Sequence, residues 1–334
     1  MKRDLKKPMD DKKIEPTEPL ISIKNLEVKF INQDATVYAV NGVDIKLERG
    51  KVLTILGESG SGKSVTMRSI LRLLPPKASL SGSIIVDGEN VIEMSQDQLS
   101  NMRGRDVSMI FQEPMVAFDP VYKVGYQIAE TVVRHLGTSF EDALARAKEL
   151  FDLVQIPSAK SRLSAYPHEL SGGMRQRAMI ALALACSPKL LLADEPTTAL
   201  DATVQIQILL LLRQLQRELG MSIIFVTHDV GVATEIADEL AVMYAGKIVE
   251  IGDVADVIKK PAHPYTQGLL SSTVNSESKG KRLEVIGGSP PDMSKLFKGC
   301  AFSPRCKKVL DQCWHQQPAP ETLSTNQIAS CFNI

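Results

Sequence analysis

Residues 57–64 read Gly57-Glu58-Ser59-Gly60-Ser61-Gly62-Lys63-Ser64, the pattern G-x-x-x-x-G-K-S of a phosphate-binding loop. A strand-like apolar run at 52–56 leads into the loop, and a helix-like run leaves it before Pro75-Pro76. Glycines let the backbone turn its N–H groups toward one anion, and the helix behind adds the positive end of its dipole. We therefore expect Lys63 at the β- and γ-phosphates of a nucleotide and the Ser64 hydroxyl on Mg²⁺. The predicted nucleotide contacts from this stretch are Gly57, Ser59, Gly60, Ser61, Gly62, Lys63, Ser64 and Val65.

Composition restricts the classes of protein that this chain can belong to. Its 334 residues suffice for one large domain or two ordinary ones, and its 39 basic residues balance 39 acidic ones. A neutral net charge argues against a general nucleic-acid binder. No apolar run approaches the roughly 18 residues of a membrane helix. The start of the chain is charged and has no apolar segment, which predicts a frayed tail and no signal peptide.

The order of apolar patterns predicts the fold class. Residues 20–56 alternate apolar and polar positions, as in a half-exposed sheet, and residues 120–165 have the pattern of charged helices. Continuous apolar runs follow at 190–193, 222–226 and 240–244, separated by helical stretches. Such runs favour an α/β protein with a parallel sheet that is covered on both faces.

A change in composition after about residue 260 predicts a separate C-terminal extension. Prolines and glycines increase there, and four of the five cysteines lie in it. The predicted segments are a flexible tail at 1–19, a main domain at 20–260 and an extension at 261–334.

Two acidic residues follow the apolar run at 190–193. Asp194 and Glu195 stand where the carboxyl end of a parallel strand is expected, which is the edge where nucleotides bind in α/β sheets. Together with the phosphate-binding loop, this position suggests that Asp194 holds Mg²⁺ through water. Glu195 is then the residue that orients and polarises an attacking water.

Four further stretches carry a family resemblance. Leu170-Ser171-Gly172-Gly173-Met174-Arg175-Gln176-Arg177 resembles the signature motif of ATP-binding cassette (ABC) transporter ATPases. Phe111-Gln112 resembles the Q-loop of that family, Ala199-Leu200-Asp201 its D-loop and Thr227-His228-Asp229 its switch histidine. The resemblance implies a P-loop NTPase of the ABC cassette type, with a RecA-like core, an antiparallel β subdomain and a helical subdomain.

The resemblance also implies a role for each motif. His228 is expected to bind the γ-phosphate and fix Glu195 with its water, and Gln112 to contact Mg²⁺, so the implied catalytic set is Glu195, His228 and Gln112. The implied Mg²⁺ contacts are Ser64, Gln112 and Asp194. In the family, the signature motif of one subunit closes on the ATP that the other subunit holds. The signature motif is expected to start a helix, and the N–H groups at that helix start would form a second anion-binding site. The residues assigned to this shared nucleotide site are Ser171, Gly172, Gly173 and Asp201.

One aromatic residue is expected to stack on the adenine ring. Phe30 is the candidate, because we expect it in a loop before the strand-like region at 38–47. Tyr38 is the competitor, but its position inside an alternating run suits packing better.

Cys300, Cys306, Cys313 and Cys331 have the spacing C-x5-C-x6-C-x17-C. A disulfide is disfavoured in a reducing compartment, and zinc usually takes more closely spaced cysteine pairs. A [4Fe–4S] cluster takes four thiolates at varied spacing. Incidental thiols and zinc remain the alternatives. Cys186 stands in an apolar helical run and is expected to be buried packing.

A narrower resemblance lies in the extension. Residues 263–270, HPYTQGLL, and residues 299–306, GCAFSPRC, resemble the C-terminal extension of oligopeptide and dipeptide importer ATPases. Several relatives in that group bind an iron–sulfur cluster through this cysteine set. The resemblance therefore implies a [4Fe–4S] cluster in preference to zinc, with a structural role in the extension. We expect ATP binding at Lys63 to survive loss of this cluster, since the phosphate-binding loop belongs to the other predicted domain.

The favoured function is the Mg²⁺-dependent ATPase subunit of an ABC importer for oligopeptides or dipeptides, at the cytoplasmic face of the membrane. The implied partners are two transmembrane permease subunits that dock near 112–127, a second ATPase chain in a heterodimer and, indirectly, an extracellular substrate-binding protein.

The alternative functions are uptake of nickel or another small solute by the same kind of ATPase, and a soluble DNA-repair or translation ATPase. The latter usually carries a coiled-coil insert or a tandem cassette, which this chain lacks. A regulatory subunit without activity is disfavoured by Glu195 and His228.

Overall fold

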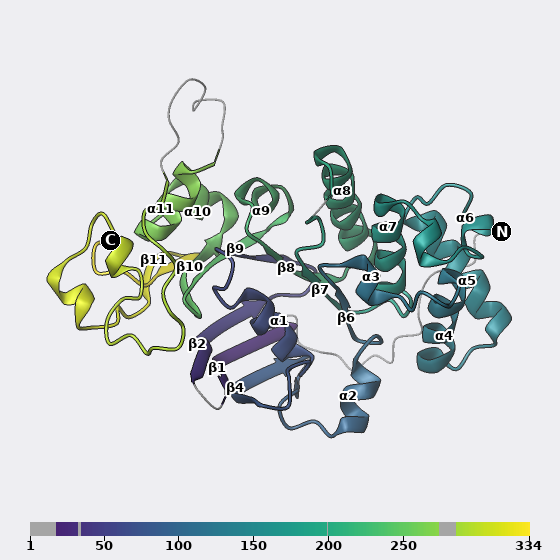
Figure 1. The fold of residues 1–334 in the computed structure, drawn as a ribbon, viewed down its shortest axis with the longest axis horizontal. Helices are drawn as coiled ribbons and strands as arrows, with labels where there is room; N and C mark the ends of the chain where they lie inside the picture. Colours follow the sequence, from purple (N-terminus) through teal and green to yellow (C-terminus); the bar gives the residue numbers. More distant parts are fainter. Residues whose placement is uncertain (1–17, 33–34, 199, 274–284) are drawn as a thin grey trace.

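The computed structural model describes residues 18–32, 35–198, 200–273 and 285–334. The predicted tail at 1–19 therefore falls almost wholly outside the described residues. Figure 1 shows a large sheet that crosses the centre of the molecule, with the helical region α3–α7 at one end and the C-terminal extension at the other. In the described part of the chain, no helix is both long and apolar enough to cross a membrane.

The large sheet has eight strands in the order β11-β12-β10-β9-β3-β8-β7-β6. The five strands β9, β3, β8, β7 and β6 run parallel, which confirms the predicted parallel core. The strands are β3 (Val52–Leu56), β6 (Val107–Ile110), β7 (Leu190–Asp194), β8 (Ser222–Thr227), β9 (Glu239–Tyr244), β10 (Lys247–Asp253), β11 (Glu321–Ser324) and β12 (Gln327–Ala329).

Both faces of the parallel part of this sheet are covered, which explains the continuous apolar runs. In β8, Ile223 and Phe225 pack in the core on the side of α8, whereas Ile224 and Val226 pack with α1 on the other side. Every residue of β8 is therefore buried, whichever way its side chain points.

The second sheet is antiparallel, with strand order β2-β1-β4-β5. Its strands are β1 (Ile21–Ile31), β2 (Thr36–Leu47), β4 (Ala78–Val86) and β5 (Glu89–Asn90). Contrary to the expectation of a loop, Phe30 lies in β1, where it pairs with Val37 of β2 and Ala78 of β4. Pairing with β2 continues to Ile31, so the strand extends past the position where the sequence suggests a loop.

The helices lie between the two sheets, in a separate helical region and along the large sheet and the extension (Figure 1). α1 lies between the two sheets (Figure 1), and its Met67 and Ile70 are fully buried there. The helical region packs α4, α5 and α7 around a core that includes Ile128, Phe151 and Ile180. The helices are α1 (Lys63–Ile70), α2 (Gln96–Met102), α3 (Pro114–Ala117), α4 (Val124–Leu136), α5 (Phe140–Leu153), α6 (Ala159–Arg162), α7 (Gly172–Ala183), α8 (Ala202–Leu219), α9 (Val230–Ile236), α10 (Val254–Lys259), α11 (Pro264–Ser271) and the 3₁₀ turns η1 (Pro167–Glu169), η3 (Ser303–Arg305) and η4 (Asp311–Trp314).

The C-terminal extension is built into the large sheet. Strand β12 pairs with β10, opposing Ala329 to Glu250. The buried Glu250 carboxylate accepts N–H groups from Ala262 at 2.9 Å, His263 at 2.9 Å and the Gln327 side chain at 2.8 Å. The extension is mostly loop, as predicted, but its two short strands continue the sheet. Three residues such as those of β12 are too few to show a strand pattern in the sequence.

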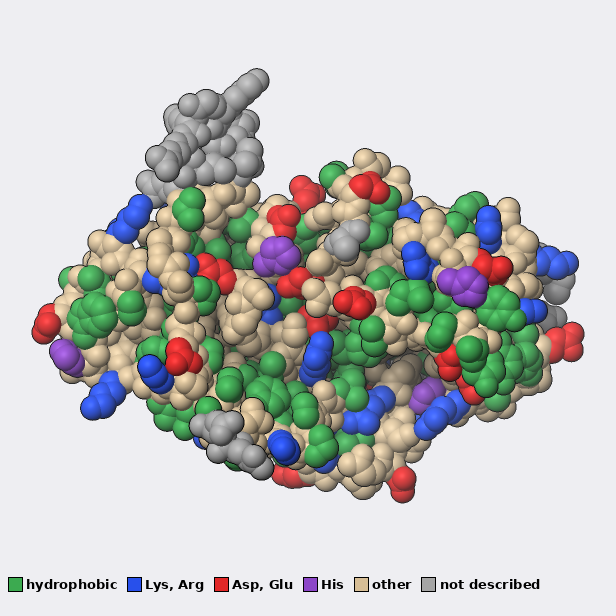
Figure 2. Space-filling model, in the orientation of Figure 1, with side chains coloured by type: hydrophobic (Ala, Val, Ile, Leu, Met, Phe, Trp, Pro, Cys, Tyr) green, Lys and Arg blue, Asp and Glu red, His purple; other side chains and the backbone are tan. Residues whose placement is uncertain are grey.

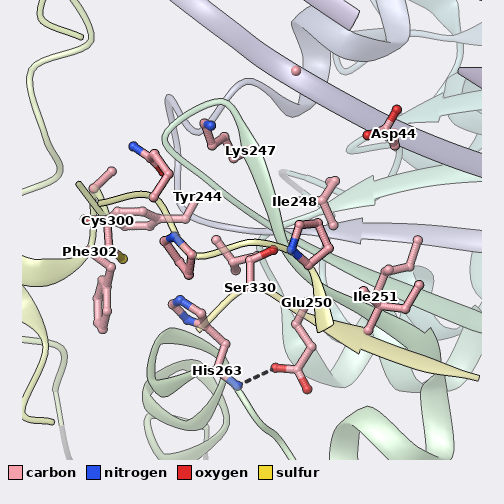
Figure 3. Close-up of a pocket in the computed structure, with 17 residues that line it drawn as sticks. Asp44, Tyr244, Lys247, Ile248, Glu250, Ile251, His263, Cys300, Phe302 and Ser330 are labelled. Carbon is pink, nitrogen blue, oxygen red and sulfur yellow. Dashed lines mark hydrogen bonds between the residues drawn. The ribbon is translucent and has the colours of Figure 1, made fainter. Parts of the chain in front are cut away.

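A pocket of about 400 Å³ lies between β10 and the extension. Figure 3 shows Tyr244, His263, Cys300 and Phe302 around it, with the His263 N–H bonded to Glu250. Burial lowers the pKa of His263 to about 4, so its ring is neutral near pH 7. Its Nδ1 accepts the Tyr265 N–H at 3.0 Å and caps α11.

Candidate active site

Two glycines of the phosphate-binding loop stand where a side chain does not fit. A Cβ on Gly57 would come within 2.3 Å of the Met243 carbonyl oxygen, and a Cβ on Gly62 within 2.4 Å of the Ala39 carbonyl oxygen. Gly62 has a φ of 106° and begins α1. The loop therefore lies against the ends of neighbouring strands, with the positive end of α1 directed into it.

Lys63 is held at the centre of the loop. Its side chain is 4% exposed, and its ammonium group donates to the carbonyl oxygens of Gly57 at 2.7 Å and Glu58 at 2.9 Å. Burial lowers the pKa of Lys63, while the charges of Glu195, Asp194 and Glu58 act in the opposite direction. The ammonium group is thus fixed where a phosphate would offer it a stronger acceptor.

Ser64 and Asp194 form an oxygen pair beside this lysine. The Ser64 hydroxyl donates to Asp194 Oδ1 at 2.7 Å, and Asp194 is 1% exposed at the end of β7. Burial raises the pKa of Asp194, and the Ser64 hydrogen bond opposes that shift. Hydroxyl and carboxylate oxygens suit Mg²⁺, which keeps several waters and takes few protein ligands beside nucleotide phosphates. Accordingly, no group of three or more His, Cys, Asp or Glu in the described residues is placed to hold a metal ion alone.

Three side chains from separate elements converge on one oxygen of Glu195. Gln112 Nε2 donates to Glu195 Oε2 at 3.4 Å, Thr198 Oγ1 donates to it at 3.0 Å, and His228 Nδ1 lies 3.3 Å away. Glu195 has a φ of 46°, in the left-handed region that is uncommon for this residue type. Backbone strain of this kind clusters at functional sites. The carboxylate is therefore positioned to accept a proton from, or orient, a water in the cavity.

These groups face one cavity of about 650 Å³. Most of the predicted ATP-site residues line it, together with several that no motif indicated. The lining residues are Val37, Ala39, Glu58, Ser59, Gly60, Gly62, Lys63, Ser64, Val65, Gln112, Glu195, Thr198, His228, Leu269 and Met293. Leu269 and Met293 come from the C-terminal extension, which therefore forms one wall of the cavity.

Some predicted residues lie behind or beside the cavity wall. Ser61 is buried, and its hydroxyl has no hydrogen-bond partner. Phe30 does not line the cavity, whereas Val37, opposite it on β2, does. The Tyr38 N–H donates to the Met293 carbonyl oxygen at 2.9 Å and joins β2 to the extension. Adenine stacking on Phe30 stays a prediction.

The signature residues lie outside this cavity. Ser171 begins α7 and accepts the Met174 N–H at 3.3 Å, and it is exposed together with Gly172. Asp201 begins α8 in the same way, accepting the Val204 N–H at 3.0 Å. Figure 1 shows α7 well apart from α1. Of the D-loop motif, Ala199 lies outside the described residues.

The four cysteines of the extension are free thiols. Backbone N–H groups donate to three of their sulfurs: Lys308 to Cys306 at 3.4 Å, Leu310 to Cys313 at 3.5 Å and Asn333 to Cys331 at 3.3 Å. Burial raises the pKa of the thiols of Cys300, Cys306 and Cys331. Within the described residues these cysteines do not form a ready metal-binding group. Cys186 is buried in the helical core, away from them.

Comparison with known proteins identifies the family. The ABC transporter family matches residues 40–198, and the oligopeptide/dipeptide transporter C-terminal region matches residues 249–313. The oligopeptide transport ATP-binding protein OppD of Salmonella typhimurium is 43% identical, over 95% of each chain. This chain belongs to the ATP-binding subunits of ABC transporters.

Two further similarities agree with this membership. OppD of Bacillus subtilis is 47% identical, over 90% of this chain and 84% of that protein. The dimeric post-hydrolysis structure of the ATP-binding cassette MJ0796, bound to ADP and Pi, matches with a TM-score of 0.63 and 27% identity, over 70% of this chain and 98% of that one. The protein is thus an ATP-hydrolysing transporter subunit of the oligopeptide and dipeptide importer family.

Glu195→Gln is expected to preserve ATP binding and to slow hydrolysis at least ~100-fold, because the amide cannot accept the proton of the attacking water. Equilibrium ATP titration and turnover in the presence of the partner chain measure the two effects. Lys63→Ala is the contrasting variant, since loss of the cation at the phosphates should weaken binding itself. Near-normal turnover of Glu195→Gln, or unchanged affinity of Lys63→Ala, would contradict the respective assignment.

Proposed function

We propose that this chain is the ATPase subunit of an importer that takes up oligopeptides or dipeptides through separate membrane subunits. The observation that carries the proposal is that Lys63, Ser64 and Glu195 line one cavity, with Asp194 hydrogen-bonded to the Ser64 hydroxyl behind its wall. Residues of the importer-type extension also line this cavity. The cargo assignment is supported by relatives named as oligopeptide transport ATP-binding proteins.

The proposed reaction is hydrolysis of the phosphoanhydride bond of ATP. Lys63 and the N–H groups at the start of α1 would bind the phosphates, and Ser64, Asp194 and Gln112 would hold Mg²⁺, which would offset phosphate charge. Glu195 would orient the attacking water, with His228 at the γ-phosphate. Catalysis then depends on positioning and on charge stabilisation, as expected for phosphoryl transfer.

We propose that the working unit contains two ATPase chains, the second a related but different one. Ser171 and Gly172 are exposed and lie outside the cavity of their own chain, so the N-terminus of α7 is free to meet a nucleotide held by a partner. The solved cassette that resembles this chain and holds ADP and Pi is a dimer.

The permease contact is proposed at α3 and the start of α4. Exposed apolar side chains gather there, namely Met115, Val116, Val121, Tyr122 and Tyr126. Figure 2 shows hydrophobic side chains over this helical end of the molecule. The segment directly follows Gln112, so a docked permease helix would lie next to a residue of the ATP site. We propose that the chain acts at the cytoplasmic face of the membrane, with an extracellular substrate-binding protein acting through the permeases.

We further propose that the extension holds a [4Fe–4S] cluster on Cys300, Cys306, Cys313 and Cys331, with zinc as the alternative. Four thiolates and N–H donors to sulfur are the environment that such clusters use. Bound metal would supply a structural cross-link for a segment with little core of its own. The thiols must lose their protons to bind, so metal loading releases protons and weakens as pH falls.

The proposed division of the chain keeps a tail at 1–19, an ATPase domain at 20–260 and an extension at 261–334. The pairing of β12 with β10 supports an extension that folds onto the ATPase domain.

Peptide uptake is expected to require this chain together with the permeases. Membrane vesicles that contain all subunits and a substrate-binding protein should accumulate a labelled oligopeptide only when ATP is supplied. Vesicles with Glu195→Gln should lose uptake, because the transport cycle then stops before hydrolysis. Uptake of nickel and of no peptide by the same vesicles would contradict the proposed cargo.

Ser171→Arg is expected to leave ATP binding to the isolated chain intact and to abolish hydrolysis at the facing site, because the arginine blocks the nucleotide of the partner. Mixed dimers with the change on one chain should lose one of two active sites. Ser161→Arg, on exposed α6, introduces the same charge in the helical region and serves as the control. Loss of ATP binding by the changed monomer would exclude the arrangement between two chains.

Anaerobically purified protein is expected to absorb near roughly 400 nm and to contain about four irons and matching sulfide. Cys306→Ser should bleach this absorption and expose the C-terminus to protease, whereas Cys186→Ser, in the helical core, should retain the colour. A metal analysis that finds one zinc and no iron would reject the iron–sulfur cluster in favour of zinc. Metal-free protein with a protease-resistant extension would contradict both.

A further inference from the structure

The phosphate-binding loop is joined to the extension by a paired salt bridge. Arg305 donates from its two terminal nitrogens to the two carboxylate oxygens of Glu58, at 2.7 and 2.9 Å. The Arg305 side chain is 5% exposed, and that of Glu58 is 26% exposed. Two parallel bonds of this kind fix direction as well as distance. The pair therefore sets the orientation of a carboxylate that belongs to the loop itself.

The surroundings of Arg305 are built to hold it in place. Its guanidinium carbon lies 5.8 Å from the centre of the Tyr244 ring, and its Nε donates to the Gly287 carbonyl oxygen at 2.9 Å. Beneath it, the rings of Tyr244, Tyr265 and Phe302 pack at centroid distances of 4.6 to 5.4 Å. The side chain thus stands between the loop and a buried aromatic cluster.

The same cluster contacts the backbone of the loop. The Tyr265 hydroxyl accepts the Glu58 N–H at 2.9 Å. The Glu58 carbonyl oxygen accepts from the Lys63 ammonium group. One loop residue is therefore held through its amide by Tyr265, through its carboxylate by Arg305 and through its carbonyl group by the lysine expected at the phosphates.

Charge gives this arrangement a consequence for nucleotide binding. Glu58 lines the cavity that Lys63 also lines, so its negative charge is close to where ATP phosphates would bind. Left unpaired, the carboxylate would repel the phosphates and compete for the Lys63 ammonium group. Pairing with Arg305 cancels its charge and turns it toward the extension.

We propose that Arg305 is a positioning residue of the ATP site, which neutralises Glu58 and fixes the phosphate-binding loop in the form that accepts ATP. The inference rests on the proposed ATPase function and adds a role of the extension in nucleotide affinity. Arg305 does not touch the nucleotide. It acts from the extension, 247 positions along the chain from Glu58, through the carboxylate it holds.

Equilibrium ATP titration of the full-length chain tests the proposal. Arg305→Met should weaken ATP binding about tenfold, as expected for an unpaired charge near the phosphates. The double variant Arg305→Met with Glu58→Gln should recover affinity to within about threefold of the original chain, because no unpaired carboxylate remains. A merely structural role of Arg305 would not be rescued by a change at Glu58.

Controls separate this proposal from the proposed function. Lys298→Met removes an exposed positive charge from the same extension and should change affinity less than about twofold. If Arg305→Met does not fold, Arg305→Gln with and without Glu58→Gln is measured instead and judged by the same criteria.

Two kinds of outcome would contradict the two proposals separately. An unchanged chain that does not bind ATP would overturn the proposed function. ATP binding that depends on Lys63 but not on Arg305, or a double variant as weak as Arg305→Met, would overturn the role of Arg305 alone.

Discussion

The site depends on the parallel pairing of β3, β8 and β7, because parallel strands end at the same edge of their sheet. β3 leads into Lys63, β7 ends at Asp194 and β8 ends just before His228. Residues far apart in sequence thereby come together: Lys63 and His228 line one cavity, and Asp194 is hydrogen-bonded to Ser64 in its wall. The polar residues of the site stand only at the ends of these strands. The strands themselves are apolar on both faces because helices cover one face and helices with a second sheet cover the other.

Much of the ATP site could be predicted because its determinants are local. Gly62 must adopt a positive φ, and Lys63 and Ser64 must follow it. Two acidic residues must end an apolar run. Each requirement can be recognised within a few residues of the sequence. The helices of residues 120–165 are equally readable, because their apolar positions repeat at helical spacing and cover a core around Ile128 and Phe151.

Other features could not be predicted, because they depend on contacts between distant segments. Phe30 belongs to β1 because Val37 and Ala78 flank it, and neither neighbour is apparent from the residues around it. β12 exists because β10 offers it an edge. Glu58 reads as a variable position of the motif, and only the fold shows Arg305 against it. The expectation that ATP binding at Lys63 survives loss of the cluster stays a prediction, and the contact between Arg305 and Glu58 bears directly on it.

The turn that carries Arg305 also carries two of the four cysteines. The Ser303 N–H donates to the Cys300 carbonyl oxygen and the Cys306 N–H to that of Ser303, so one short turn spaces both thiols and sets the direction of the guanidinium group. Whatever orders this turn therefore also orders the Glu58 carboxylate in the phosphate-binding loop. For a loop-rich segment with a small core of its own, a cross-link such as the proposed metal cluster would add rigidity. The extension contacts the phosphate-binding loop through the ion pair of Arg305 and Glu58, while the exposed Ser171 at the start of α7 lies outside the cavity that this loop lines.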